Sequence, residues 1–243
     1  MFAGMAASFT MVVSGTIVNV AVPSVIGAFG IGLDQAQLIT TAFNIAMVTS
    51  QLLSAWLVAA FGQRAGFLLM AGVFTLGSVI GGLGQTYDMI VVGRVLQGVA
   101  AGVIQPLVMV VAFQVFPADR RGYAMAIYSM GIFLAVAAGP VFGGIAIDLL
   151  HWRYIFWAPL PVIFVAALMG WVFMPSVRSE ERKEFDWVGY ILLIASVYCL
   201  VTALTEGNRE GWTSSYIIVL LIIGFAGGIT LIWTQLQDWS SLI

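Results

Sequence analysis

The sequence predicts an all-α membrane protein with about eight transmembrane helices. Of its 243 residues, 61% are hydrophobic and only 8% are charged. The mean hydropathy is +1.05. A soluble domain carries about 25% charged residues, so most of this chain is suited to contact lipid or other apolar segments instead of water.

Each predicted span is a mostly apolar run of about 20 residues, the length that crosses the hydrocarbon core. Short polar or Gly/Pro segments separate the runs, as expected for neighbouring antiparallel helices. The ten-residue alternating pattern of membrane β-strands is not seen. The predicted spans cover residues 5–27, 36–59, 65–84, 88–113, 123–147, 154–174, 187–205 and 215–234.

The longest break follows the sixth span and is rich in charge. We interpret it as a boundary between helical bundles. The sequence therefore predicts a six-helix amino-terminal bundle over residues 1–175 and a charged cytoplasmic linker over residues 176–186. Two additional transmembrane helices and a short tail follow over residues 187–243.

The distribution of basic residues predicts the orientation, because Lys and Arg are retained on the cytoplasmic side. A cytoplasmic amino terminus puts only Arg153 and Arg209 in outside loops. The inside loops then hold Arg64, Arg120, Arg121, Arg178, Arg182 and Lys183. We expect a multi-pass protein of the plasma (inner) membrane with both termini in the cytoplasm.

Arg94 falls inside the fourth predicted span. A charge there costs about 2.5–3.5 kcal/mol unless it faces the bundle or water. Arg94, Gln97, Ala101 and Gln105 follow one another at helical spacing, which predicts a polar stripe on one face. The alternative is an arginine near the end of the helix whose side chain extends to the lipid headgroups.

Two further patterns have a functional and a structural interpretation. In the fifth span, Gly139 and Gly143 form part of a row of small residues beside Pro140 and Gly144, which lets a second helix approach closely. Polar residues also share faces of the first two spans: Thr16 and Asn19, and Asn44 and Gln51. These side chains can line a substrate cavity or tie the helices together.

Other functions are disfavoured by composition. One cysteine, Cys199, and one histidine, His151, exclude a disulfide framework and a Cys/His metal cluster. Nine basic residues and a net charge of −2 argue against nucleic acid as a partner. No nucleophile or metal motif indicates an enzyme, and we predict no cofactor. No Asp or Glu lies well inside the first six spans.

Four motifs occur in order along these spans. They are Gly15-Thr16-Ile17-Val18-Asn19-Val20-Ala21-Val22-Pro23, Arg94-Val95-Leu96-Gln97-Gly98, Gly139-Pro140-Val141-Phe142-Gly143-Gly144 and His151-Trp152-Arg153-Tyr154-Ile155-Phe156. Together they resemble the major facilitator superfamily, and within it the amino-terminal portion of the fourteen-helix drug:proton antiporter family. The resemblance covers essentially the whole chain.

The resemblance implies a secondary active transporter that exports amphipathic or cationic organic compounds in exchange for protons. Arg94, with Gln97 and Gly98, is expected to assist proton coupling. Gly139, Pro140, Gly143 and Gly144 are expected to shape a helix that moves during alternating access. The residues expected to line the central cavity are Ser14, Thr16, Asn19, Asn44, Gln51 and Gln105.

Two features of the sequence depart from the family pattern. Ser14 stands where the family has an Asp in the first helix, which affects the expectations of cation selectivity and proton coupling. Of the charged loop motif after the second helix, only Gly62 and the basic Arg64 remain, so the usual charge latch is altered.

A fourteen-helix member has further helices beyond the eighth. The chain is therefore expected to be part of a longer protein or to work with a partner chain that supplies the missing carboxy-terminal half. Two alternatives to a drug exporter stay open: a truncated accessory protein of the membrane without transport activity, and an exporter of a metabolite with the same fold.

Overall fold

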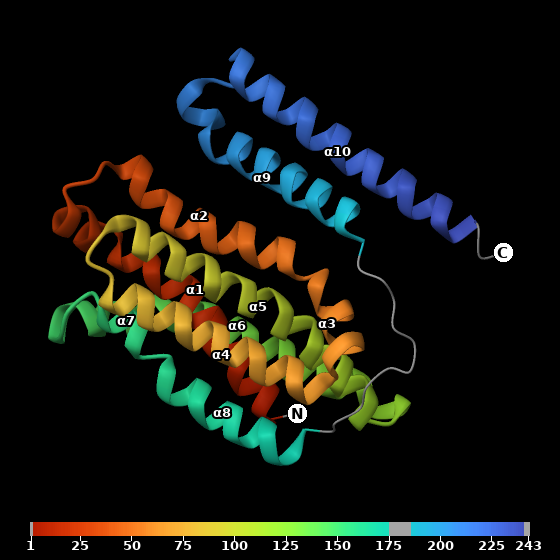
Figure 1. Cartoon of the computed structure of the whole chain (residues 1–243). Helices are drawn as coiled ribbons and strands as arrows, with labels where there is room; N and C mark the ends of the chain where they lie inside the picture. The colour runs from red at the N-terminus through yellow and green to blue at the C-terminus, as the bar shows by residue number, and fades with distance from the viewer. Residues whose placement is uncertain (1, 175–185, 241–243) are drawn as a thin grey trace. The chain divides into compact units, whose positions relative to one another are not determined.

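The computed structural model describes residues 2–174 and 186–240, and every regular element in these ranges is a helix (Figure 1). The chain divides into two compact units, Met1–Lys183 and Glu184–Ile243. The predicted charged linker, residues 176–186, lies outside the described residues except for Asp186. The predicted domain limits therefore stay a prediction.

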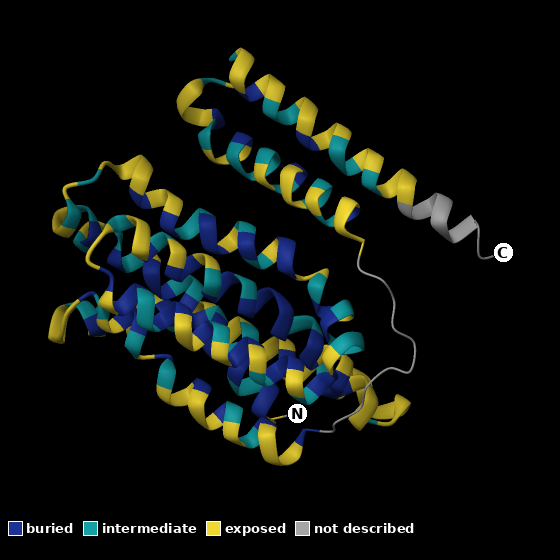
Figure 2. Ribbon diagram, viewed as in Figure 1, coloured by how far each residue is buried: buried dark blue, intermediate teal, exposed yellow. Residues whose placement is uncertain are grey.

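The first unit is a bundle of helices joined by short turns. Its elements are α1 (Phe2–Phe29), α2 (Leu33–Ser50), α3 (Leu53–Phe61), α4 (Gln63–Leu83), α5 (Tyr87–Val115), the 3-10 turn η1 (Ala118–Arg120), α6 (Arg121–Leu149), α7 (Tyr154–Trp157) and α8 (Leu160–Phe173). Helix α5 packs against α4, α2 and α1, and α1 also packs against α6 and α8. Figure 2 shows buried residues along α5 and exposed residues on the outer helix faces.

The described helices confirm the all-α membrane fold. Seven stretches are long and apolar enough to span a membrane, and α2 with α3 forms an eighth if the bent pair is one span. The span predicted over residues 36–59 corresponds to this pair, and the chain bends by 56° between α2 and α3. Tighter turns replace the regular helical bonds there. The amide of Gln51 donates to Val48, and the amide of Ser54 donates to Gln51, each three residues back.

Two glycines end helices because they adopt a backbone conformation that other residues avoid. Gly30 has φ +62° and follows α1, and Gly62 has φ +83° between α3 and α4. Their amides donate to the carbonyls of Ile26 and Val58, four residues back. A left-handed glycine at this place is a common way to end a helix. These glycines account for two of the short breaks between the predicted spans.

Helices α4 and α5 approach through glycine. A Cβ added to Gly77 would lie 2.7 Å from the carbonyl oxygen of Gly93, and a Cβ added to Gly93 would lie 2.7 Å from that of Gly77. Real Cβ atoms do not tolerate such distances, so the two backbones touch where side chains are absent. This contact holds the amino-terminal part of α5 next to the carboxy-terminal half of α4.

The second unit contains α9 (Trp187–Glu210) and α10 (Ser215–Ser240), two helices that pack against each other. The side chain of Asp186 accepts a hydrogen bond from the amide of Gly189 at 2.8 Å and so caps the start of α9. At the other end, the Trp212 indole donates to Asn208 at 2.9 Å. Most described side chains of α10, including Tyr216 and Trp233, are exposed within this unit.

Candidate functional site

A layer of buried polar side chains crosses the first unit. We call Ser14, Ser78, Arg94 and Gln97 the polar layer. All four residues are buried, and Arg94, Gln97 and Ser78 are 0% exposed. They come from α1, α4 and α5. An arginine excluded from contact with lipid is what the helical spacing of Arg94 and Gln97 predicted.

The polar layer separates two apolar clusters. Along α1, Met11 belongs to one cluster and Ile17 to the other, with Ser14 between them. Along α5, Ile90 and Ala100 lie in different clusters on either side of Arg94 and Gln97. The guanidinium therefore sits between two dry regions of the bundle, and its polar contacts are confined to this layer.

Hydrogen bonds connect the three helices of the polar layer. Nη1 of Arg94 donates to the carbonyl oxygen of Ser14 at 3.0 Å and to Oε1 of Gln97 at 2.8 Å. Nε2 of Gln97 donates in turn to the hydroxyl of Ser78 at 2.8 Å. One amide thus relays the contact from α5 to α4, while the arginine reaches α1.

Phe43 covers the guanidinium from α2. Its ring centroid lies 4.2 Å from Cζ of Arg94, a cation–π contact. The ring is also close to α1, because a Cβ added to Gly15 would lie 3.0 Å from it. Sequence reasoning missed Phe43, since a single aromatic in an apolar helix carries no signal. It also missed Ser78, a small hydroxyl side chain in an apolar, glycine-rich stretch of α4.

The polar layer has an unbalanced charge. The acidic residues described in the first unit are Asp34, Asp88, Asp119 and Asp148, and each lies at or near a helix end. Among the described residues, the Nε and Nη2 donors of Arg94 are buried without a hydrogen-bond partner. A buried charge without a counter-charge is strongly unfavourable, so these donors are the most unusual chemical feature of the bundle.

The residues that were expected to line the cavity range from buried to exposed. Ser14 is buried, and Thr16 and Gln105 are half-buried. The amides Asn19, Asn44 and Gln51 are exposed within the first unit. The structure therefore does not bring these amides into the polar layer, and their role in lining a cavity stays a prediction.

The half-buried and exposed residues make contacts of their own. Thr16 donates to the carbonyls of Val12 and Val13 in its own helix. Asn19 accepts a hydrogen bond from Thr40 at 3.2 Å, which links α1 to α2. Nε2 of Gln105 lies 3.9 Å from the sulfur of Met47. These contacts suit the interpretation that the polar residues tie helices together as well as the interpretation that they meet a substrate.

The glycine-rich motif of α6 has two faces. Gly139 and Gly143 are buried against α1, where an added Cβ would clash with Thr16 or lie 3.0 Å from the carbonyl oxygen of Ile17. Pro140 is exposed, and a Cβ added to Gly144 would meet nothing within 4 Å. Only half of the motif is thus used in packing between described helices.

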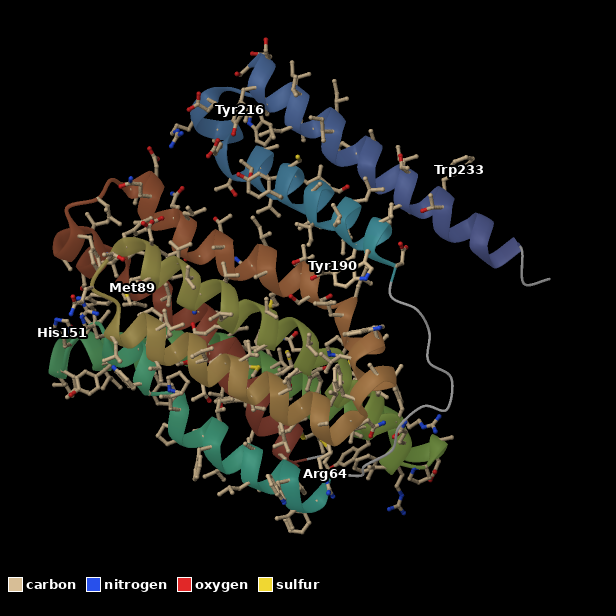
Figure 3. The ribbon with its side chains drawn as sticks, in the orientation of Figure 1. Arg64, Met89, His151, Tyr190, Tyr216 and Trp233 are labelled. Carbon is tan, nitrogen blue, oxygen red and sulfur yellow. The ribbon has the colours of Figure 1, made fainter. Side chains whose placement is uncertain are left out.

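At one end of the bundle, the remnant of the loop motif joins three helices. Nε of Arg64 donates to the carbonyl oxygen of Met174 at 2.9 Å, at the end of α8. Beside it, Nε2 of Gln63 donates to Oε1 of Gln114 at 2.7 Å, which connects the start of α4 to the end of α5. Figure 3 shows Arg64 at this end and His151 at the opposite end of the unit.

At the His151 end, the aromatic motif ties α4 to α7. Nη1 of Arg153 donates to the carbonyls of Gly82 and Gly84, where α4 ends, and its guanidinium lies over Trp152. The Trp152 ring meets Phe29 of α1 edge-on, with centroids 5.9 Å apart. The motif is therefore a connection between helix ends in this structure.

Comparison with known proteins agrees with the motifs. Residues 4–242 match the family model described as the Major Facilitator Superfamily. The chain is 32% identical to the multidrug export protein EmrB of Haemophilus influenzae over 96% of the chain and 46% of that protein. It is 28% identical to the multidrug resistance protein Stp of Mycobacterium tuberculosis strain H37Rv over 93% of the chain and 42% of that protein. The chain thus spans about half the length of these relatives.

Solved structures agree on the fold. A peptide transporter of the POT family, solved in complex with alafosfalin, matches with a TM-score of 0.67 and 14% identity, over 88% of this chain and 52% of the other. A D-xylose–proton symporter matches with a TM-score of 0.63 and 16% identity, over 99% of this chain and 68% of the other.

These matches confirm the resemblance inferred from the four motifs and the prediction that the chain is not an enzyme. The described helices supply the membrane spans that such a protein needs. The chain is a multi-pass membrane protein that belongs to the Major Facilitator Superfamily.

Proposed function

We propose that this chain is the amino-terminal part of a secondary active transporter that exports amphipathic organic compounds in exchange for protons by alternating access. The observation that carries the proposal is the polar layer around Arg94. A buried arginine held by α1, α4 and α5 is costly for a protein that only needs to span the membrane. Such a residue is typical of a solute or ion pathway.

Three arguments support the individual parts of the proposal. Export of organic compounds is suggested by relatives named multidrug export and multidrug resistance proteins. Proton exchange enters through the motif resemblance, in which Arg94, Gln97 and Gly98 take part in coupling. Alternating access is suggested by the half of the α6 motif, including Pro140 and Gly144, that does not pack on α1.

The proposal also fixes an orientation in the plasma (inner) membrane. Arg64, Arg120 and Arg121 lie near the end where α4 begins and α5 ends. Arg153 lies at the other end, where α4 stops. The excess of basic residues assigns the first end to the cytoplasm. With this assignment, the predicted linker between the six-helix bundle and the two additional helices lies in the cytoplasm.

The proposal is tested with the complete reading frame that contains this sequence, expressed in an efflux-deficient bacterium. Inside-out vesicles carrying a pH-sensitive dye report proton movement when an organic substrate is added. We expect substrate-dependent proton release and drug tolerance, both lost in Arg94→Ala. Val95→Ala is the matched control, because Val95 adjoins Arg94 but is exposed on α5.

The abundance of each variant in the membrane is measured in parallel. Drug tolerance equal to that of cells with an empty vector, together with no transport of any tested compound, would reject the transporter and favour the accessory protein. Transport of a metabolite without drug tolerance would keep the fold and change the cargo. Substrate movement without proton movement would remove the exchange from the proposal.

A further inference from the structure

The two unpartnered donors of Arg94 lie on one edge of its guanidinium. Nη1 is occupied by Ser14 and Gln97, whereas Nε and Nη2 have no partner among the described residues. Nε–H and the neighbouring Nη2–H of an arginine point in parallel. This pair is the planar fork that binds a carboxylate or another oxyanion through two hydrogen bonds.

The polar layer holds this fork in place. The contacts of Nη1 fix one side of the guanidinium, and the ring of Phe43 covers its face. Gln97 cannot turn without losing its bond to Ser78. The fork is therefore oriented before any ligand arrives, which reduces the entropy cost of binding.

No described acidic residue neutralises the fork. From α1, position 14 contributes its backbone carbonyl, 3.0 Å from Nη1, and the residue there is a buried, uncharged serine. The described carboxylates of the first unit lie at or near helix ends. Within the described residues the fork therefore has no counter-charge, and an anionic ligand would supply one.

We infer that the Nε–Nη2 edge of Arg94 binds the oxyanion head group of an amphipathic organic anion, such as an aromatic carboxylate. This inference deepens the proposed function and rests on it for the statement that the ligand is the cargo. An amphipathic ligand is favoured over an inorganic anion because apolar clusters lie on both sides of the polar layer. These clusters suit an apolar body and do not replace the hydration of a small ion.

This ligand class differs in charge from the cationic compounds that the resemblance implies. A cation placed beside Arg94 would be repelled, and no described carboxylate in the polar layer would attract it. Arg94 is 0% exposed, so the layer is closed in this structure. A ligand reaches the fork when the helices around it separate, as they do in a transporter that alternates its access.

The test measures binding of 2-naphthoate to the purified full chain by equilibrium dialysis. Neutral 2-naphthamide and cationic 2-naphthylmethylammonium are the matched probes. We expect the amide and the ammonium to bind at least about tenfold more weakly than the carboxylate, because the fork prefers a charged acceptor.

Two variants of Ser14 separate charge from size. Ser14→Asp adds a carboxylate at the position whose backbone carbonyl Arg94 binds, whereas Ser14→Asn adds a side chain of similar volume without the charge. We expect 2-naphthoate to bind about tenfold more weakly to the Asp variant than to the Asn variant. Arg94→Lys gives an independent measure, because lysine keeps the charge and lacks the fork. It should also reduce affinity roughly tenfold.

Several results would overturn the inference. They are equal affinity of the Asp and Asn variants, equal affinity for the carboxylate and the amide, and full affinity in Arg94→Lys. Competition by sulfate or chloride at the concentration of 2-naphthoate would assign an inorganic anion site instead. Specific binding without transport would reject the proposed function but keep the site. Proton-coupled efflux that is unchanged in Ser14→Asp would do the reverse.

Discussion

Oε1 of Gln97 lies 2.8 Å from Nη1 of Arg94, one helical turn away on α5, and Nε2 of Gln97 reaches Ser78 on α4. Among the described residues, Gln97 is thus the only side chain that accepts a hydrogen bond from Arg94. Its loss should cost more than the loss of an ordinary amide, because a buried charged donor is left with one partner fewer.

We therefore predict different free energies of unfolding for two substitutions of Gln97. Gln97→Leu should lower the free energy of unfolding by about 2–3 kcal/mol, since it strands a charged donor and the Ser78 hydroxyl. Gln97→Glu keeps the shape, adds the missing negative charge and should be more stable than the Leu variant. Thermal unfolding in detergent compares the two. Equal midpoints would mean that Gln97 does not hold the guanidinium.

The spans could be predicted because the bilayer imposes a length and a polarity on each helix. The sequence was less informative about which face of each helix points into the bundle. In a membrane bundle, both the lipid face and the core face are apolar, so hydrophobic periodicity does not distinguish them. Asn19 and Asn44 show this limit: the helical spacing placed each on a polar face, but not whether that face is buried. Arg94 could be placed because its charge tolerates so few environments.

The bend between α2 and α3 also lies beyond sequence reasoning. Gln51 and Leu52 contain neither the proline nor the glycine that usually marks a break. Just before the bend, α5 packs tightly on α2, where a Cβ added to Gly102 would clash with the carbonyl oxygen of Met47. Such a contact depends on residues far apart in the chain, and no local pattern reports it.

The two faces of the α6 motif lead to a matched pair of substitutions. Gly139→Val should lower the free energy of unfolding by about 1–3 kcal/mol, because its side chain would overlap Thr16 and force α1 and α6 apart. Gly144→Val should have little effect on folding, since no atom lies within 4 Å of the added Cβ. The yield of monodisperse protein and the thermal midpoint measure both effects.

The functional meaning of Gly144 is measured separately from its stability. If the half of the motif that does not pack on α1 serves alternating access, Gly144→Val should impair transport in a protein that folds normally. Normal transport in this variant would limit the motif to its packing role at Gly139 and Gly143. Equal damage to stability by both valines would contradict the arrangement of α6 against α1.

The Gln63–Gln114 hydrogen bond is a contact between two neutral side chains at the end of the bundle that holds Arg64. We predict a coupling of about 1 kcal/mol between the two glutamines in a double-mutant cycle of Gln63→Ala and Gln114→Ala. The coupling should be the same at low and high salt, because neither side chain carries a charge that ions can screen. A coupling that falls with salt would indicate that Arg64 takes part in it.

Labelling from the two sides of the membrane checks the proposed orientation. In a Cys199→Ser background, single cysteines replace Ala118 in η1 and His151 before α7; both positions are exposed. Ala118 lies in the turn before Arg120 and Arg121, whereas His151 lies at the opposite end of the bundle from Arg64 (Figure 3). The basic residues should keep the first end in the cytoplasm.

A maleimide that cannot cross the membrane should therefore label His151→Cys in intact cells and Ala118→Cys only after permeabilisation. Detergent-solubilised protein serves as the control that both thiols react when access is equal. The reverse pattern would turn the bundle over and place Arg153, with its contacts to Gly82 and Gly84, on the cytoplasmic side. Labelling of both cysteines in intact cells would contradict a span between them, because α6 alone joins the two positions.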